Sequence, residues 1–210
     1  MRIALPDDRR RILTELQESI RRIERRPARR GGGVPCGVAD VDAAAPDGFP
    51  RGAISELAGG PASGKTAVAL SLLAGLGPEE LFAWVDGRGE LYPPAAAARG
   101  VDLGRLLIVR PGAVPESASA QAPLWAAEAL LGSSAFAAVV IDVPVPRVER
   151  GWDATARRLQ AAAEKGGAVG LWLASPRAQA RLPATLRLEL EADGERVRAR
   201  RMVGGIGRVA

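Results

Sequence analysis

Short apolar runs alternate with segments of helical periodicity along most of the chain. Such runs predict buried strands, whereas apolar residues spaced three and four apart predict helices. The predicted strands are Ala53–Ala58, Leu81–Val85, Leu106–Val109, Phe136–Ile141 and Ala168–Ala174, and the predicted helices are Lys65–Leu76, Pro93–Arg99, Ala118–Leu131 and Asp153–Glu164. This alternation predicts an α/β fold with a mostly parallel central sheet and helices on both faces.

The last part of the chain has a different pattern. Thr185–Leu190 and Arg196–Met202 alternate between apolar and polar side chains, and Asp193-Gly194 lies between them. Alternation with a period of two predicts strands, and Asp-Gly is a frequent hairpin turn. We therefore expect a C-terminal β-hairpin at an edge of the sheet.

The first segment predicts an amphipathic helix from about Asp7 to Arg26. Its apolar stripe consists of Leu13, Leu16, Ile20 and Ile23. Pro27 and three glycines at 31–33 end this helix and form a flexible hinge. Residues 1–33 are thus expected to form a helical arm and linker, and residues 34–210 the core. The stripe either packs on its own core or docks on a neighbouring subunit or partner.

The four tryptophans allow the pattern to be tested at single positions. Trp84 and Trp172 lie within predicted buried strands, and we expect both in the core. Trp125 is expected on the buried face of its helix. For Trp152, packing in the core and stacking on a nucleic-acid base both remain open.

Positive charge is concentrated near the N-terminus. The net charge is +5, and residues 1–30 hold ten of the 29 basic and five of the 24 acidic residues, which leaves 19 of each elsewhere. A basic surface on the core must therefore be local. The chain has no histidine, which excludes His-dependent triads and metal sites.

The single cysteine, Cys36, rules out an intramolecular disulfide. Together with an N-terminus that lacks the apolar core of a signal peptide, this leads us to expect a cytoplasmic protein. Residues 121–141 are apolar, but Pro123, Glu128 and a Gly-Ser-Ser turn interrupt them. We expect a helix followed by a strand there and no contact with a membrane.

A glycine-rich motif follows the first predicted strand. It fits the pattern G-x-x-x-x-G-K-[ST] of phosphate-binding loops and consists of Gly59, Gly60, Pro61, Ala62, Ser63, Gly64, Lys65 and Thr66. Glycines allow backbone N–H groups to converge on a phosphate, and the next helix adds the positive end of its dipole. We expect Lys65 to contact the terminal phosphates of ATP or another triphosphate and Thr66 to bind Mg²⁺.

Two carboxylates end predicted strands on the same side of the sheet. Asp142 follows four apolar residues, as in a Walker-B strand, and is expected to hold Mg²⁺ and so help bind the nucleotide. Asp86 ends another strand and could line the same site.

Residues 36–66 resemble the RecA recombinase family. Cys36–Asp42 is similar to the stretch that enters the RecA core, and Gly48–Gly52 leads into the phosphate loop as it does there. A weaker resemblance covers nearly the whole chain, including the N-terminal helix, which resembles the RecA segment that docks on the adjacent subunit. The resemblance implies a RecA-like core and self-association.

Several positions depart from the RecA pattern. Arg88 stands where RecA has the glutamate that activates water, and Glu90, two residues later, is a weak substitute. Ala95 replaces the tyrosine that stacks on adenine, and Ser175 replaces the glutamine that senses the γ-phosphate. Both DNA-binding loops are short. These departures imply weak or absent ATP hydrolysis.

A short RecA paralogue with these departures resembles the ImuA family of damage-induced mutagenesis. The resemblance implies an accessory role in translesion synthesis under the SOS response. It also implies partnership with an ImuB-like Y-family polymerase homologue, and possible contact with RecA. DNA binding is implied as well, either directly or through the partner.

Two other functions remain open. In an active DNA-dependent ATPase of the RecA class, Glu90 would act as the base. The DNA contacts would then be Arg147, Arg150, Arg157 and Arg158, which follow the Asp142 strand. In an inhibitor resembling the SulA family, the fold would serve only to bind a protein, and the phosphate loop would be unnecessary.

Overall fold

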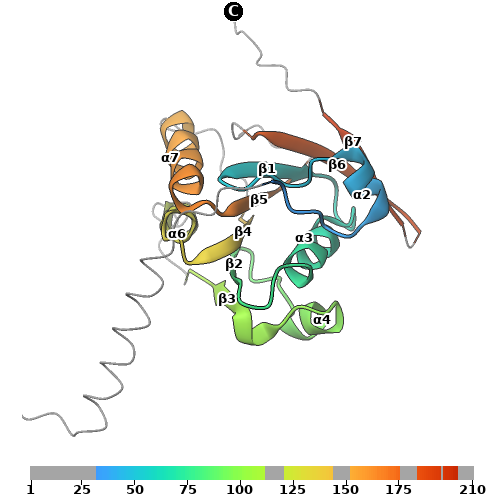
Figure 1. The fold of residues 1–210 in the computed structure, drawn as a ribbon, viewed down its shortest axis with the longest axis horizontal. Helices are drawn as coiled ribbons and strands as arrows, with labels where there is room; N and C mark the ends of the chain where they lie inside the picture. Colours follow the sequence, from blue (N-terminus) through green and yellow to red (C-terminus); the bar gives the residue numbers. More distant parts are fainter. Residues whose placement is uncertain (1–31, 112–120, 144–151, 176–183, 195, 203–210) are drawn as a thin grey trace, which may run out of the picture.

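The computed structural model describes residues 32–111, 121–143, 152–175, 184–194 and 196–202. Seven strands form one sheet in the order β3-β2-β4-β5-β1-β6-β7 (Figure 1). The strands are β1 (Ala53–Ala58), β2 (Leu81–Asp86), β3 (Leu106–Val109), β4 (Phe136–Asp142), β5 (Val169–Ala174), β6 (Leu186–Asp193) and β7 (Arg196–Arg201). The helices are α2 (Ala39–Ala44), α3 (Lys65–Ala74), α4 (Pro93–Ala98), the 3₁₀ turn η1 (Leu103–Arg105), α6 (Gln121–Gly132) and α7 (Trp152–Gly166).

The sheet is parallel except at its C-terminal edge. β1 pairs in parallel with both β5 and β6, and β4 lies between β2 and β5. Among the strands that the structure describes, β6 and β7 form the antiparallel pair, in which Asp193 pairs with Arg196 next to the turn. The predicted α/β fold and its edge hairpin are confirmed. Because parallel strands end on the same side, the C-terminal ends of β1, β2, β4 and β5 converge on one edge of the sheet.

Helices cover both faces of the sheet (Figure 1), and the sheet separates two apolar layers of the core. Near the C-terminal end of β4 the side chains alternate between the layers, so that Val140 belongs to the layer with α3 and Ile141 to the layer with α6 and α7. Trp84 and Trp172 are buried as predicted. Sequence reasoning missed α2 and η1, since each is too short to show helical periodicity.

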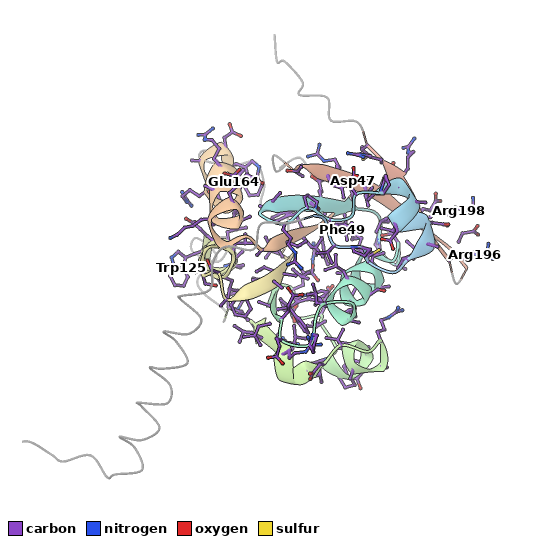
Figure 2. The ribbon with its side chains drawn as sticks, viewed as in Figure 1. Asp47, Phe49, Trp125, Glu164, Arg196 and Arg198 are labelled. Atoms are coloured by element: carbon purple, nitrogen blue, oxygen red, sulfur yellow. The ribbon has the colours of Figure 1, made fainter. Side chains whose placement is uncertain are left out.

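The prediction for Trp125 is wrong. Its side chain points outward from α6 and is 71% exposed (Figure 2). The buried stripe of α6 runs through Leu124, Ala127 and Leu131, and a residue one position along a helix lies about 100° away from such a stripe.

Of the two possibilities left open for Trp152, the structure shows packing in the core. Trp152 begins the buried stripe of α7, which continues through Ala156, Leu159 and Ala163. Its ring meets that of Trp172 edge to face, with centroids 5.9 Å apart, so it is not available for stacking on a base.

Several predictions fall outside the described residues. These are the N-terminal helix with its stripe at Leu13, Leu16, Ile20 and Ile23, and the candidate DNA contacts Arg147 and Arg150. Among the helices that the structure does describe, none is both long and apolar enough to span a membrane.

Candidate nucleotide-binding site

The phosphate-loop motif connects a fully buried strand to a helix. β1 ends at Ala58 and α3 begins at Lys65. The Gly59 N–H donates to the Ala174 carbonyl at the end of β5, at 3.2 Å, which anchors the loop to the C-terminal edge of the sheet. This strand–loop–helix arrangement is the context that the sequence motif requires for binding phosphate.

Two glycines of the loop lie where a side chain would not fit. Gly64 has a φ of +91°, and a Cβ there would lie 2.5 Å from Val197 Cγ2. A Cβ on Gly59 would lie 2.7 Å from the Leu190 carbonyl oxygen. Both neighbours belong to the β6–β7 hairpin, which therefore packs against the loop. The sequence predicted the hairpin but missed this contact, because nothing local links residues 59–64 to residues 190–197.

The Lys65 ammonium group folds back over the loop. Its Nζ donates to the carbonyls of Gly59 and Gly60, at 2.6 and 2.8 Å, and to Ser63 Oγ at 3.2 Å. Burial lowers the pKa of Lys65, whereas the Asp142 charge raises it and the Arg88 charge lowers it. The ammonium group thus lies against the carbonyls of the loop, close enough to Asp142 and Arg88 for their charges to act on it.

One pocket of about 370 Å³ brings most of the predicted binding residues together. Its lining comes from the phosphate loop and from the ends of β2, β4 and β5. The lining residues are Gly59, Pro61, Ala62, Lys65, Thr66, Arg88, Glu90, Asp142, Leu173, Ala174 and Ser175. Strands far apart in sequence supply this lining because parallel strands end at the same edge.

Arg88 contacts the carboxylate that was predicted to hold Mg²⁺. Its Nε donates to Asp142 Oδ1 at 3.0 Å, and its Nη2 to the Val143 carbonyl at 3.4 Å. Burial raises the pKa of Asp142, Arg88 lowers it through charge and hydrogen bonding, and Asp86 and Glu90 raise it. Thr66 and Asp142 line the same pocket, and their oxygen atoms are suitable ligands for a magnesium ion. However, Arg88 already neutralises the charge of the Asp142 carboxylate.

Asp86 has a structural role, and the prediction that it could line the pocket is wrong. Its Oδ1 accepts from the Glu90 N–H at 3.0 Å, and its Oδ2 accepts from the Leu91 N–H at 3.2 Å and from Arg110 Nε at 2.8 Å. The carboxylate is buried beneath the loop that carries Arg88. It fixes that loop and is not turned toward the pocket.

The remaining candidates lie in different places. Glu90 lines the pocket together with Arg88 and Lys65, whereas Ala95 is exposed on α4. Arg157 and Arg158 are exposed on α7, and Arg158 Nε contacts Glu128 Oε2 of α6 at 3.0 Å. No α7 residue is part of the pocket lining, so these two arginines are separate from it.

A larger hollow of about 870 Å³ lies between the phosphate loop and the hairpin. Gly60 and Ser63 line it, together with Gly59, Pro61, Ala62 and residues 189–192 and 198–200. Its charged side chains include Arg200, which is paired across the hairpin with Glu189. Lys65, Thr66 and Asp142 do not line this hollow, so we place the phosphate chemistry in the smaller pocket.

Known proteins resemble this chain in sequence. The model of the RecA N-terminal domain matches residues 16–161. The RecA protein of Picosynechococcus sp. is 37% identical over 120 residues, which cover 55% of this chain and 33% of that protein. The RecA protein of Clostridioides difficile is 39% identical over 106 residues, covering 49% and 29%. The aligned part thus spans about a third of these relatives.

The fold also resembles a solved structure. The crystal structure of the RadB recombinase superposes with a TM-score of 0.61 and 19% identity, covering 77% of this chain and 84% of that one. An identity this low supports the shared fold alone. The family model, in contrast, matches more than half of the sequence. The chain therefore belongs to the RecA N-terminal domain family.

Proposed function

We propose that this chain is a RecA-like nucleotide-binding accessory protein of DNA damage tolerance, with weak or absent ATP hydrolysis. The observation that carries the proposal is the Arg88–Asp142 ion pair, 3.0 Å long, beside an intact phosphate loop. The loop keeps the groups that hold phosphate, whereas Arg88, by the resemblance to RecA, takes the position of the glutamate that activates water.

The residues of the pocket suggest how a triphosphate is held. Backbone N–H groups of the loop and the N-terminus of α3 bind the phosphates, and Lys65 exchanges the carbonyls of Gly59 and Gly60 for phosphate oxygens. Thr66 and Asp142 are the residues that would hold Mg²⁺. When bound, that ion would neutralise phosphate charge.

Weak hydrolysis follows from the groups beside the phosphates. A general base contributes about 10²–10⁴-fold to such a reaction. Arg88 cannot accept a proton at neutral pH, because a guanidinium group stays protonated. Among the described lining residues, Glu90 is the carboxylate besides Asp142.

The biological setting rests on the resemblance to the ImuA family. We propose an ImuB-like Y-family polymerase homologue as partner in the cytoplasm, with RecA as a further contact. The stripe of Leu13, Leu16, Ile20 and Ile23 is the proposed docking surface for the partner or for a second copy. DNA would be reached directly, through arginines such as Arg157, or through the partner.

The second candidate is an active DNA-dependent ATPase. The presence of Glu90 in the same pocket as Lys65 favours it, since a displaced base could still reach a water molecule. A SulA-like inhibitor is disfavoured, because a purely protein-binding scaffold has no need for the loop geometry described above.

Calorimetry with ATP·Mg²⁺ and a non-hydrolysable analogue, followed by a turnover assay with single-stranded DNA, tests these functions. We expect similar affinities for the two nucleotides and little turnover. Turnover near that of a RecA enzyme, lost on Lys65→Ala, would establish the ATPase. Absence of any nucleotide binding would overturn the proposal and favour the inhibitor.

A further inference from the structure

The wall of the pocket at the ends of β2 and β4 carries an arginine that two hydrogen bonds hold in place. The Arg88 side chain is 33% exposed and that of Asp142 12%, so their contact is largely shielded from water. A second hydrogen bond, from Nη2 to the Val143 carbonyl, orients the guanidinium plane. Nη1 has no hydrogen-bond acceptor among the described residues, and the side chain lines the pocket.

The fold holds the backbone that positions Arg88. The Gly87 N–H donates to the Asp142 carbonyl at 2.8 Å, and Asp86 binds the N–H groups of Glu90 and Leu91. Gly89 turns the chain with a φ of +68°. Hydrogen bonds on both sides of Arg88 thus hold it next to Asp142, which reduces the conformational freedom lost when it binds an anion.

Among the described residues that line the pocket, positive and negative charges balance without a metal ion. Lys65 and Arg88 are positive, and Glu90 and Asp142 are negative. If Arg88 were absent, the Asp142 carboxylate would face the phosphates uncompensated, and a divalent cation would be needed to separate like charges. With Arg88 in place, one carboxylate is already neutralised and a guanidinium group remains available to phosphate oxygens.

We propose that Arg88 and a divalent cation are alternative partners of Asp142, so that this pocket binds nucleoside triphosphate without requiring Mg²⁺. This inference rests on the nucleotide binding proposed above. Arg88 supplies within the chain the positive charge that a bound cation supplies from solution. Mg²⁺ then has to displace Arg88 before it can reach the carboxylate.

The test is calorimetry of ATP with the full chain, in Mg²⁺ and in EDTA. For the unmodified chain we expect affinities within about threefold of each other. In Arg88→Ala, the affinity in EDTA should fall about tenfold, as expected for a lost charge-assisted contact, and Mg²⁺ should restore it. Arg99→Ala removes an exposed arginine that does not line the pocket, and it should change neither value.

Two further variants keep the test independent of folding. Arg88→Gln retains most of the side-chain length if the alanine variant fails to fold, and melting curves check both. Adding Asp142→Asn to the Arg88 variant should recover part of the binding in EDTA, because the uncompensated carboxylate is gone while the contact from Arg88 to phosphate stays lost. Mn²⁺ binding in the presence of ATP, followed by electron paramagnetic resonance, should become tighter in Arg88→Gln than in the unmodified chain.

The outcomes separate this inference from the proposed function. One outcome would overturn the role of Arg88 and leave nucleotide binding intact. In it, binding depends on Lys65, the affinity falls more than about tenfold from Mg²⁺ to EDTA, and the Arg88 variants show the same ratio of the two affinities. No binding in either condition would overturn nucleotide binding itself, and this inference with it.

Discussion

The two walls of the pocket differ in what they retain of nucleotide chemistry. The phosphate-loop wall, from Gly59 to Thr66, has the strand, the turn and the helix that a triphosphate needs. The other wall, at the ends of β2 and β4, has Asp142 paired with Arg88, and the Asp86 carboxylate is buried behind that wall, outside the pocket lining. The comparison suggests that binding and hydrolysis are separable, and that this chain keeps the groups for the first.

The largest expected effect is on the phosphate-loop wall. Lys65→Ala should weaken ATP binding about a hundredfold, because the ammonium group makes several charge-assisted hydrogen bonds to phosphate. Calorimetry measures the loss. Lys165→Ala is the matched control, since that lysine lies at the end of α7, away from the pocket. Equal affinities for the two variants would remove the loop from the binding site.

The next effect is on stability. Gly64→Ala should lower the free energy of unfolding by about 1–3 kcal/mol, because Gly64 has a positive φ and a Cβ would overlap Val197. Urea denaturation measures it, with Gly60→Ala as the control, since a Cβ at Gly60 meets nothing within 4 Å. Adding Val197→Ala should recover the steric part of the loss. If Gly64→Ala were as stable as Gly60→Ala, the packing of the hairpin on the loop would be wrong.

Behind the wall that carries Arg88, Asp86→Asn should cost about 1–3 kcal/mol of unfolding free energy, because the amide cannot satisfy two backbone N–H groups and Arg110 together. Asp102→Asn is the exposed counterpart, since Asp102 also accepts from a backbone N–H and an arginine, but with a 57% exposed side chain. We expect Asp102→Asn to lower the free energy of unfolding by less than about 1 kcal/mol, as is typical of surface ion pairs. Chemical denaturation of both variants gives the difference. If both cost the same, burial of Asp86 would not decide its contribution.

The smallest effect is a pH dependence at Asp142. Its pKa is raised in the folded state, mainly by burial, so the folded chain holds this proton more tightly than the unfolded chain. The free energy of unfolding therefore falls as pH rises from the ordinary pKa of an aspartate to the raised pKa of Asp142. Asp142→Asn should remove this contribution, so its stability relative to the unmodified chain should grow with pH over that acidic window. Denaturation midpoints at several pH values test the sign, and a difference that shrinks with rising pH would contradict it.

Two tryptophans, one on α6 and one on α7, show how far a sequence can be interpreted. Trp152 and Trp125 have the same residue type, yet the first lies on the buried stripe of its helix and the second is one position away from such a stripe. Periodicity predicts that a helix has a buried face. Which residues occupy that face depends on the rotation of the helix against the sheet, and packing sets that rotation.

The sequence by itself determined the alternation of strands and helices, the edge hairpin and the phosphate loop. These features depend on hydrophobic periodicity and on glycines close together in the chain, so they can be recognised locally. Only the tertiary structure decided that Arg88 pairs with Asp142, that Asp86 fixes a loop, and that Val197 packs on Gly64. The physical reason is that these contacts join residues far apart in sequence or depend on the direction of a side chain. The order of the strands and the packing of the sheet together decide which residues meet and where their side chains point.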